Sequence, residues 1–153
     1  MRLEVTRRAE LAVQAITVLT ERGRLKSGAL AAALDTTPGF VAQVVNPLVK
    51  AGFVRSEPGP SGGYLLHPEA GRLSVLEVIE AVDGPTDTGQ CVVVDRPCGG
   101  LTPCVVHQAW SRARGALLHD LANTPVASRQ ARLPGTDGRK THEHSDSGHP
   151  AIG

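Results

Sequence analysis

Aromatic residues are scarce in this sequence, because Phe, Trp and Tyr together make up only 3% of its 153 residues. A hydrophobic core must therefore be built mainly from Leu, Val, Ile and Ala. No apolar stretch approaches the roughly 18 residues that a membrane span needs. The start also lacks the apolar run of about 7–15 residues that is typical of a secretory signal. We expect a cytoplasmic protein with no membrane partner.

A strong charge imbalance is also missing, since the formal net charge is +1. Overall charge therefore does not indicate a nucleic-acid-binding protein. Residues 1–60 alone contain eight Lys/Arg against five Asp/Glu, which is a small positive excess on that part of the chain. The length fits one domain of modest core size with a segment left over.

Cysteine is scarce too, and the chain contains only Cys91, Cys98 and Cys104. An odd number of cysteines in a reducing compartment argues against a scaffold of disulfides. All three fall within 14 residues of one another. Such crowding favours metal binding or redox chemistry.

Helix signals dominate the first third of the chain. Thr6 can cap a helix that runs to about residue 22, and a short helix is expected over 27–34. Thr37 as N-cap and Pro38 in the first turn predict a third helix over 38–50.

The third predicted helix has two different faces. Its core-facing positions are Val41, Val44, Val45 and Leu48. Its opposite face carries Gly39, Gln43, Asn46 and Lys50. Two short helices with a polar outer face on the second are typical of a DNA-binding helix-turn-helix, although any small helical domain can contain such a pair.

A β-hairpin is predicted directly after these helices, from strand-like residues 53–56 and 64–67 around a Gly/Pro-rich turn. A hairpin in this position is a wing. Ser74 and Glu77 then form a capping box for a fourth helix. The fold class is thus mainly α with a small β-hairpin wing, and residues 1–84 form a winged helix-turn-helix domain.

The remainder divides into three parts. Residues 85–102 form a cysteine-containing loop, and 103–125 form a long helix that Thr102 and Pro103 begin. Val106, Ala109, Trp110, Ala113, Leu117 and Leu121 give that helix an apolar stripe. The stripe fits packing on the helix's own core or, as we expect, dimerisation with a second copy. Residues 126–153 are polar, contain three histidines (His142, His144 and His149), and are predicted to be a disordered tail.

The chemical motif is Cys91-x6-Cys98-x5-Cys104-x2-His107. Iron–sulfur clusters are held by closely spaced thiolates, sometimes with one His or carboxylate in place of a Cys. The predicted helix places Cys104 in its first turn, where the helix dipole favours a thiolate, and places His107 on the same face. Zinc bound by three cysteines and one histidine, a metal-free thiol switch, and unmetallated thiols are the alternatives. A Cys104–His107 nucleophile and base would make an enzyme, but the chain lacks a cofactor-binding loop, so we predict no enzyme.

These features together resemble the IscR/NsrR-type winged-helix regulators of the Rrf2 family. The resemblance covers residues 1 to about 125. The segments that carry it are Met1-Arg2-Leu3, the wing Gly59-x-x-Gly62-Gly63-Tyr64-Leu65-Leu66, Val75-x-Glu77-Val78-Ile79-x-Ala81-Val82-Asp83-Gly84, and the three cysteines with His107 and Trp110. It implies a homodimer that binds pseudo-palindromic double-stranded DNA, usually as a repressor, and senses redox state, nitric oxide or cluster supply through an iron–sulfur cluster.

The resemblance also implies the cluster ligands. Cys91, Cys98 and Cys104 match the three cysteines, with a first gap of six residues where five is common. The fourth ligand is His107 in IscR-like members, whereas Glu10 falls where NsrR-like members place a carboxylate from the partner subunit. We favour [2Fe-2S] with His107 and retain [4Fe-4S] with Glu10.

The predicted DNA-binding residues are Thr37, Gly39, Gln43, Asn46, Lys50, Arg55 and Ser61. Gln43 and Asn46 can each pair with adenine, whereas Lys50 and Arg55 suit phosphate or the minor groove. Pro47 should kink the third helix at a cost of about 3 kcal/mol. Pro58 stands where relatives often carry a minor-groove Arg, and Arg55 is the nearest substitute in the hairpin.

Overall fold

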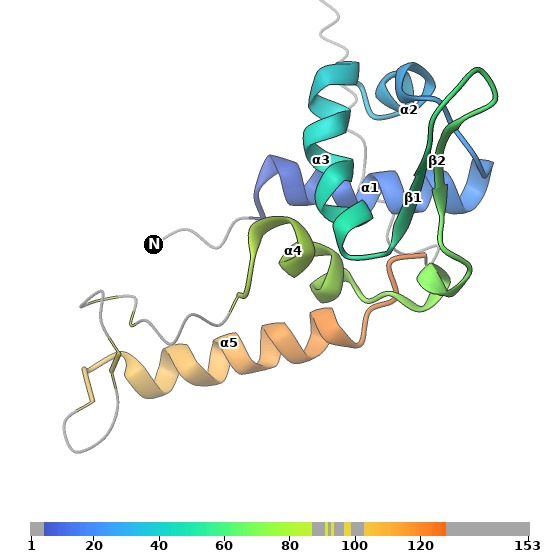
Figure 1. Ribbon diagram of the computed structural model, residues 1–153. Helices are drawn as coiled ribbons and strands as arrows, with labels where there is room; N and C mark the ends of the chain where they lie inside the picture. The colour runs from blue at the N-terminus through green and yellow to red at the C-terminus, as the bar shows by residue number, and fades with distance from the viewer. Residues whose placement is uncertain (1–4, 87–90, 92, 94–96, 99–102, 128–153) are drawn as a thin grey trace, which may run out of the picture.

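The computed structural model describes residues 5–86, 91, 93, 97–98 and 103–127. Their elements, in chain order, are α1 (Arg7–Arg22), α2 (Ser27–Ala33), α3 (Pro38–Lys50), β1 (Val54–Glu57), β2 (Gly63–Leu66), the 3-10 helix η1 (Pro68–Arg72), α4 (Val75–Asp83) and α5 (His107–Ala122). Helices α1–α4 and the hairpin surround one core, and α5 lies along the outer side of α4 (Figure 1). The predicted fold class, mainly α with a β-hairpin wing and a long C-terminal helix, is confirmed.

Helix α1 forms where the sequence predicts it. The Thr6 side chain accepts a hydrogen bond from the Ala9 amide at 3.1 Å, which satisfies one of the free N–H groups of the first turn. Gly23 ends the helix with φ of 71°, a left-handed conformation that favours glycine. The buried face of α1 consists of Ala9, Leu11, Ala12, Val13, Ala15, Ile16 and Leu19.

Helices α2 and α3 form the predicted helix-turn-helix. Thr37 caps α3 by accepting from the Phe40 amide at 3.3 Å, and Pro38 is the first helical residue. The four residues expected to face the core are all buried: Val41, Val44, Val45 and Leu48. Helix α3 continues through Pro47 as one element to Lys50. Because proline has no N–H, Pro47 cannot donate to the Gln43 carbonyl.

The wing is an antiparallel hairpin in which Val54 pairs with Leu66 and Glu57 with Gly63. Both strands are displaced by one residue from the predicted ranges 53–56 and 64–67. A third segment joins the hairpin, because the Leu25 amide donates to the Tyr64 carbonyl at 3.0 Å and the Tyr64 amide donates back at 2.8 Å. The connection between α1 and α2 is therefore tied to β2.

Helix α4 begins with the predicted capping box. The Ser74 amide donates to the Glu77 carboxylate at 2.8 Å, and the Glu77 amide donates to the Ser74 hydroxyl at 3.2 Å. The 3-10 helix η1 just before it was not predicted.

After α5 the chain returns to the core. Val126 is 0% exposed, and its amide donates to the Leu73 carbonyl at 2.8 Å. The assignment of the tail to 126–153 is therefore wrong at Val126, because that side chain fills a space beside α1 and α4. Residues 128–153, with the three tail histidines, lie outside the described residues.

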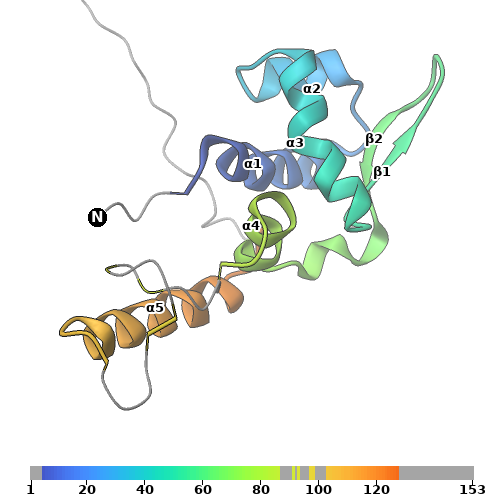
Figure 2. The same ribbon diagram turned by 60° about the vertical axis from the view of Figure 1, so that its left-hand side comes forward.

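Helix α5 begins later than predicted, at His107 rather than near Pro103. The His107 amide donates to the Cys104 carbonyl at 3.0 Å, which closes a turn of three residues instead of an α-helical turn. Val105 and Val106 lie in this turn, and β-branched side chains favour helix weakly. No residue of α5 is buried within the single chain. Figure 2 shows this helix projecting away from the body formed by the other elements.

Candidate metal centre and nucleic-acid interface

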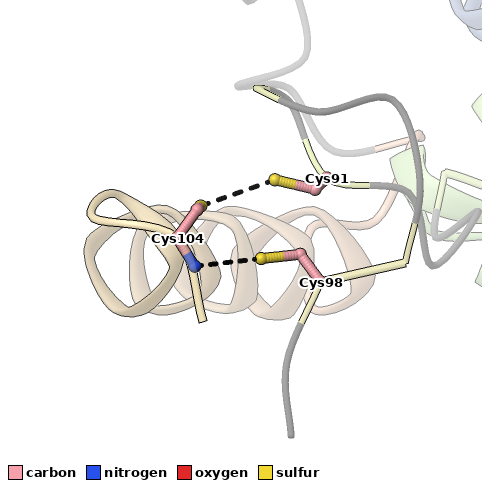
Figure 3. A group of neighbouring side chains, drawn as sticks. All are labelled: Cys91, Cys98 and Cys104. Atoms are coloured by element: carbon pink, nitrogen blue, oxygen red, sulfur yellow. Dashed lines mark hydrogen bonds between the residues drawn. The ribbon is translucent and has the colours of Figure 1, made fainter. Parts of the chain in front are cut away.

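Three cysteines converge just before α5. The Sγ atoms of Cys91, Cys98 and Cys104 all lie within 4.8 Å of one another, and those of Cys91 and Cys104 are 3.5 Å apart. Figure 3 shows Cys91 and Cys98 extending toward Cys104 from the preceding loop. We call these three residues the cysteine site.

Backbone amides point at two of the sulfurs. The Cys104 amide donates to Cys98 Sγ at 3.2 Å, and the Val93 amide donates to Cys91 Sγ at 3.4 Å. Donors of this kind stabilise negative charge on sulfur and tune metal–thiolate centres. The loop therefore presents its sulfurs in a setting that suits a thiolate-bound metal.

The predicted setting of Cys104 needs correction. The residue precedes α5 by three positions and is not in the first turn of that helix. Burial raises the pKa of the Cys104 thiol, and hydrogen bonds with the Cys91 and Cys98 side chains raise it further. The Val106 amide acts in the opposite direction but is outweighed. Burial and the two neighbouring thiols thus favour the neutral form of the Cys104 side chain.

The two predicted fourth ligands lie apart from the cysteine site. His107 is the half-buried first residue of α5, whereas Glu10 is on α1. Neither side chain belongs to the group of ligand atoms that lie within 4.8 Å of one another. The Glu10 carboxylate accepts from Arg7 Nη1 at 2.9 Å and from Gln14 Nε2 at 3.2 Å. Within one chain, the structure brings together three of the five predicted metal ligands.

The predicted DNA-binding residues lie on α3 and the wing, and all are exposed. On α3 they are Gly39, Gln43, Asn46 and Lys50, which we call the recognition face. Thr37 precedes it and uses its hydroxyl to cap α3. Arg55 and Ser61 are on the hairpin, and the Ser61 carbonyl accepts from Arg24 Nη1 at 3.1 Å. Figure 2 shows the hairpin on the opposite side of the molecule from the start of α5, which Cys104 precedes by three positions.

Thr86, the last described residue before Cys91, is held by two helices. Glu80 of α4 accepts from the Thr86 amide at 3.0 Å and from its hydroxyl at 2.6 Å. Arg114 of α5 donates to the Thr86 carbonyl. The Thr86 hydrogen bonds lower the pKa of the Glu80 carboxyl below its ordinary value. We call these three residues the Thr86 clamp; no local sequence signal indicated it.

A largely apolar groove of about 650 Å³ lies between α4 and α5. Its apolar lining includes Ile79, Trp110, Ala113, Leu117, Leu118 and Leu121. Trp110 Nε1 is buried there and has no hydrogen-bond partner within the described part of the chain. A buried donor without a partner is costly, and the residues that the structure describes supply none for this one.

None of the described helices is long and apolar enough to span a membrane.

Comparison with known proteins agrees with this fold. The family model for Rrf2, described as an iron-dependent transcriptional regulator, matches residues 5–129. An HTH-type transcriptional regulator of Neisseria meningitidis is 28% identical over 94% of this chain and 95% of its own length. The HTH-type transcriptional regulator IscR of Citrobacter koseri is 34% identical over 68% of this chain and 65% of its own length. These relatives are named as regulators of transcription, a non-enzymatic activity.

Among solved structures, IscR of T. potens has a TM-score of 0.64 at 20% identity and covers 86% of this chain and 92% of its own. This structural similarity supports the winged-helix fold described above. The family match extends from α1 through α5 and includes the cysteine site. The chain belongs to the Rrf2 family of winged-helix transcriptional regulators.

Proposed function

We propose that this regulator binds promoter DNA through α3 and the wing, and that an iron–sulfur cluster on Cys91, Cys98 and Cys104 controls this binding. The observation that carries the proposal is the convergence of three thiols within 4.8 Å at the start of α5. The family description as iron-dependent and the similarity to IscR support it. Repression is the mode we infer, as the resemblance implies.

The residues of the cysteine site fit such a cluster. Soft thiolates are the ligands that iron–sulfur clusters use, and amide donors to Cys91 and Cys98 offset the charge of metal-bound sulfur. When bound, the cluster would supply one-electron redox chemistry and reactivity toward nitric oxide. His107 would be the fourth ligand of a [2Fe-2S] cluster, which we favour. Glu10 of a second subunit would complete a [4Fe-4S] cluster.

A homodimer is the assembly we propose. Helix α5 has no buried residue in the single chain, and Leu117 in its apolar stripe is 46% exposed. The groove beside it contains Trp110 Nε1, for which no described residue is a hydrogen-bond partner. A second copy of α5 would cover these surfaces, and a two-fold dimer presents two recognition faces to a pseudo-palindromic operator.

The recognition face would enter the major groove. Gln43 and Asn46 are exposed, and their amide groups can donate to and accept from the edge of adenine. Lys50 and Arg55 are exposed cations near the same surface, and we infer that they contact phosphate. Thr37, Gly39 and Ser61 would approach the DNA backbone.

A chain of contacts links the cysteine loop to the DNA-binding domain. The Thr86 clamp fixes the start of the loop to α4 and α5. At the end of α4, Asp83 accepts from the Thr6 hydroxyl at 2.7 Å, and Arg8 donates to the Val82 carbonyl at 2.5 Å. Both donors belong to the start of α1. A change in the loop would thereby bias the position of α1, and we infer that holo and apo dimers differ in operator affinity.

The first experiment is anaerobic purification, followed by a visible absorption spectrum and assays of iron and acid-labile sulfide. Brown protein with about two or four iron atoms and matching sulfide per chain is expected. Cys98→Ala should lose both, whereas Ser111→Ala, an exposed change on α5, should lose neither. Equal operator affinity of holo and apo protein at the same salt would refute the sensing mechanism.

A structural zinc site is the second candidate, and one distance favours it. Two sulfurs on one tetrahedral zinc lie about 3.8 Å apart, given Zn–S bonds of about 2.3 Å. The Cys91 and Cys104 sulfurs are separated by 3.5 Å. Colourless protein with about one zinc per chain would support this candidate and leave the DNA-binding proposal intact. Colourless protein without metal would instead support a thiol switch.

A further inference from the structure

The wing has almost no positive charge of its own. Residues 54–66 contain one cation, Arg55, and one anion, Glu57. A hairpin that lies against the phosphate backbone gains most of its affinity from Lys and Arg. The two charges of this hairpin cancel, so a cation for its tip must come from elsewhere in the chain.

Arg24 reaches the hairpin from the connection between α1 and α2. Its Nη1 atom lies 2.7 Å from the Glu57 carboxylate and donates to the Ser61 carbonyl at 3.1 Å. Both contacts use Nη1, and within the described part of the chain neither Nε nor Nη2 has a partner. The Arg24 side chain is 44% exposed. Donors of a planar guanidinium therefore remain available beside the wing tip.

The backbone holds Arg24 in this place. Leu25, the next residue, pairs in both directions with Tyr64 of β2. Gly63 has φ of 142°, and a Cβ atom there would lie 2.5 Å from the Leu25 carbonyl oxygen. Only glycine allows the connection to approach β2 so closely. Arg24 is thus positioned on the hairpin by main-chain contacts, independently of its ion pair.

The ion pair itself has little value for folding, because an exposed pair of this kind contributes almost nothing to stability. Its consequence is electrostatic: it neutralises Glu57 at the surface where DNA would approach. We propose that Arg24 is a DNA-contacting residue of the wing and donates to a backbone phosphate beside Ser61. The proposal rests on the proposed DNA-binding function.

Salt dependence of binding tests this proposal. A short fluorescein-labelled duplex of random sequence is titrated with the full-length protein over a series of salt concentrations, and the logarithm of affinity is plotted against that of salt. Arg24→Gln should weaken binding about tenfold at low salt and reduce the slope by about 1 per subunit. Arg24→Lys keeps the charge and should retain the slope. Arg72→Gln removes one exposed charge from η1 and serves as the matched control, with no change expected.

Glu57→Gln distinguishes two roles of Arg24: direct contact with DNA, and stabilisation of the wing through the ion pair with Glu57. It breaks the ion pair but leaves the cation, so a DNA contact predicts an unchanged slope and equal or tighter binding. Weaker binding of Glu57→Gln, matching that of Arg24→Gln, would overturn the inference. So would an Arg24→Gln slope equal to that of the wild type. Wild-type protein without salt-dependent binding would refute the proposed function as well.

Discussion

Replacing Val126 with alanine should lower the free energy of unfolding by about 2 kcal/mol. The Val126 side chain is 0% exposed, and the substitution removes two methyl groups from the core. Each buried methyl contributes about 0.8 kcal/mol of transfer free energy, and the remaining cavity adds to the loss. The backbone contacts of this residue with Leu73 and Thr17 stay possible, so the change isolates side-chain packing.

Urea denaturation followed by far-ultraviolet circular dichroism measures this effect. The urea concentration at the unfolding midpoint should fall. The dependence of the unfolding free energy on urea concentration should change little, because nearly the same surface is exposed on unfolding. Val105→Ala is the matched control, because it makes the same chemical change at a side chain that is 98% exposed. It should alter the unfolding free energy by less than about 0.5 kcal/mol.

A loss in Val126→Ala no larger than in Val105→Ala would refute the reasoning. It would mean that the segment after α5 does not pack against α1 and α4 in solution. A loss of unfolding free energy in Val126→Ala of the predicted size would establish that the folded domain extends past α5.

Three further outcomes follow from individual contacts. Because hydrogen bonds from Thr86 lower the pKa of Glu80 in the folded chain, the unfolded chain binds more protons around and below pH 4.5. The Glu80 contribution to stability is therefore present above that pH and is lost as pH falls, and Glu80→Gln should flatten this part of the stability–pH curve. Thr6→Ala should lower the unfolding free energy by about 1–2 kcal/mol through loss of the α1 cap, and Thr6→Ser should restore most of it, as measured by thermal denaturation. Asn46→Ala should reduce preference for the operator over random DNA by about 1–3 kcal/mol while leaving the salt slope unchanged, as competition binding would show.

The sequence predicts the elements whose causes are local. Thr37 and Pro38 begin α3, Ser74 and Glu77 cap α4, and the 3.6-residue spacing of valines marks the buried face of α3. Each signal lies within one or two helical turns of its effect. The three cysteines are likewise close along the chain, so their convergence is readable from spacing alone.

Features that depend on distant residues were missed or misplaced. Val126 is buried against helices far earlier in the chain, and a polar flanking sequence gave no sign of that contact. Leu25 pairs with Tyr64 although nothing near Leu25 resembles a strand. The start of α5 was misplaced because Pro103 is a valid helix-start residue, while the turn at Cys104 depends on sulfur contacts within the cysteine loop. Glu10, one of the two proposed fourth ligands, would act from a second subunit, and residue spacing within one chain does not encode contacts between subunits.

The Thr86 clamp has a consequence for how this protein tolerates variation. Because Glu80 and Arg114 hold Thr86 directly, the packing of α4 against α5 does not rely on the length of the segment that follows. Lengthening a loop between fixed ends adds only a small entropic cost. The segment that carries the cysteines could therefore change in length and in cysteine spacing, and could acquire other ligands. The winged-helix domain and its packing against α5 would stay the same. The proposed cluster site and the proposed DNA-binding surface could thus vary in sequence independently of each other.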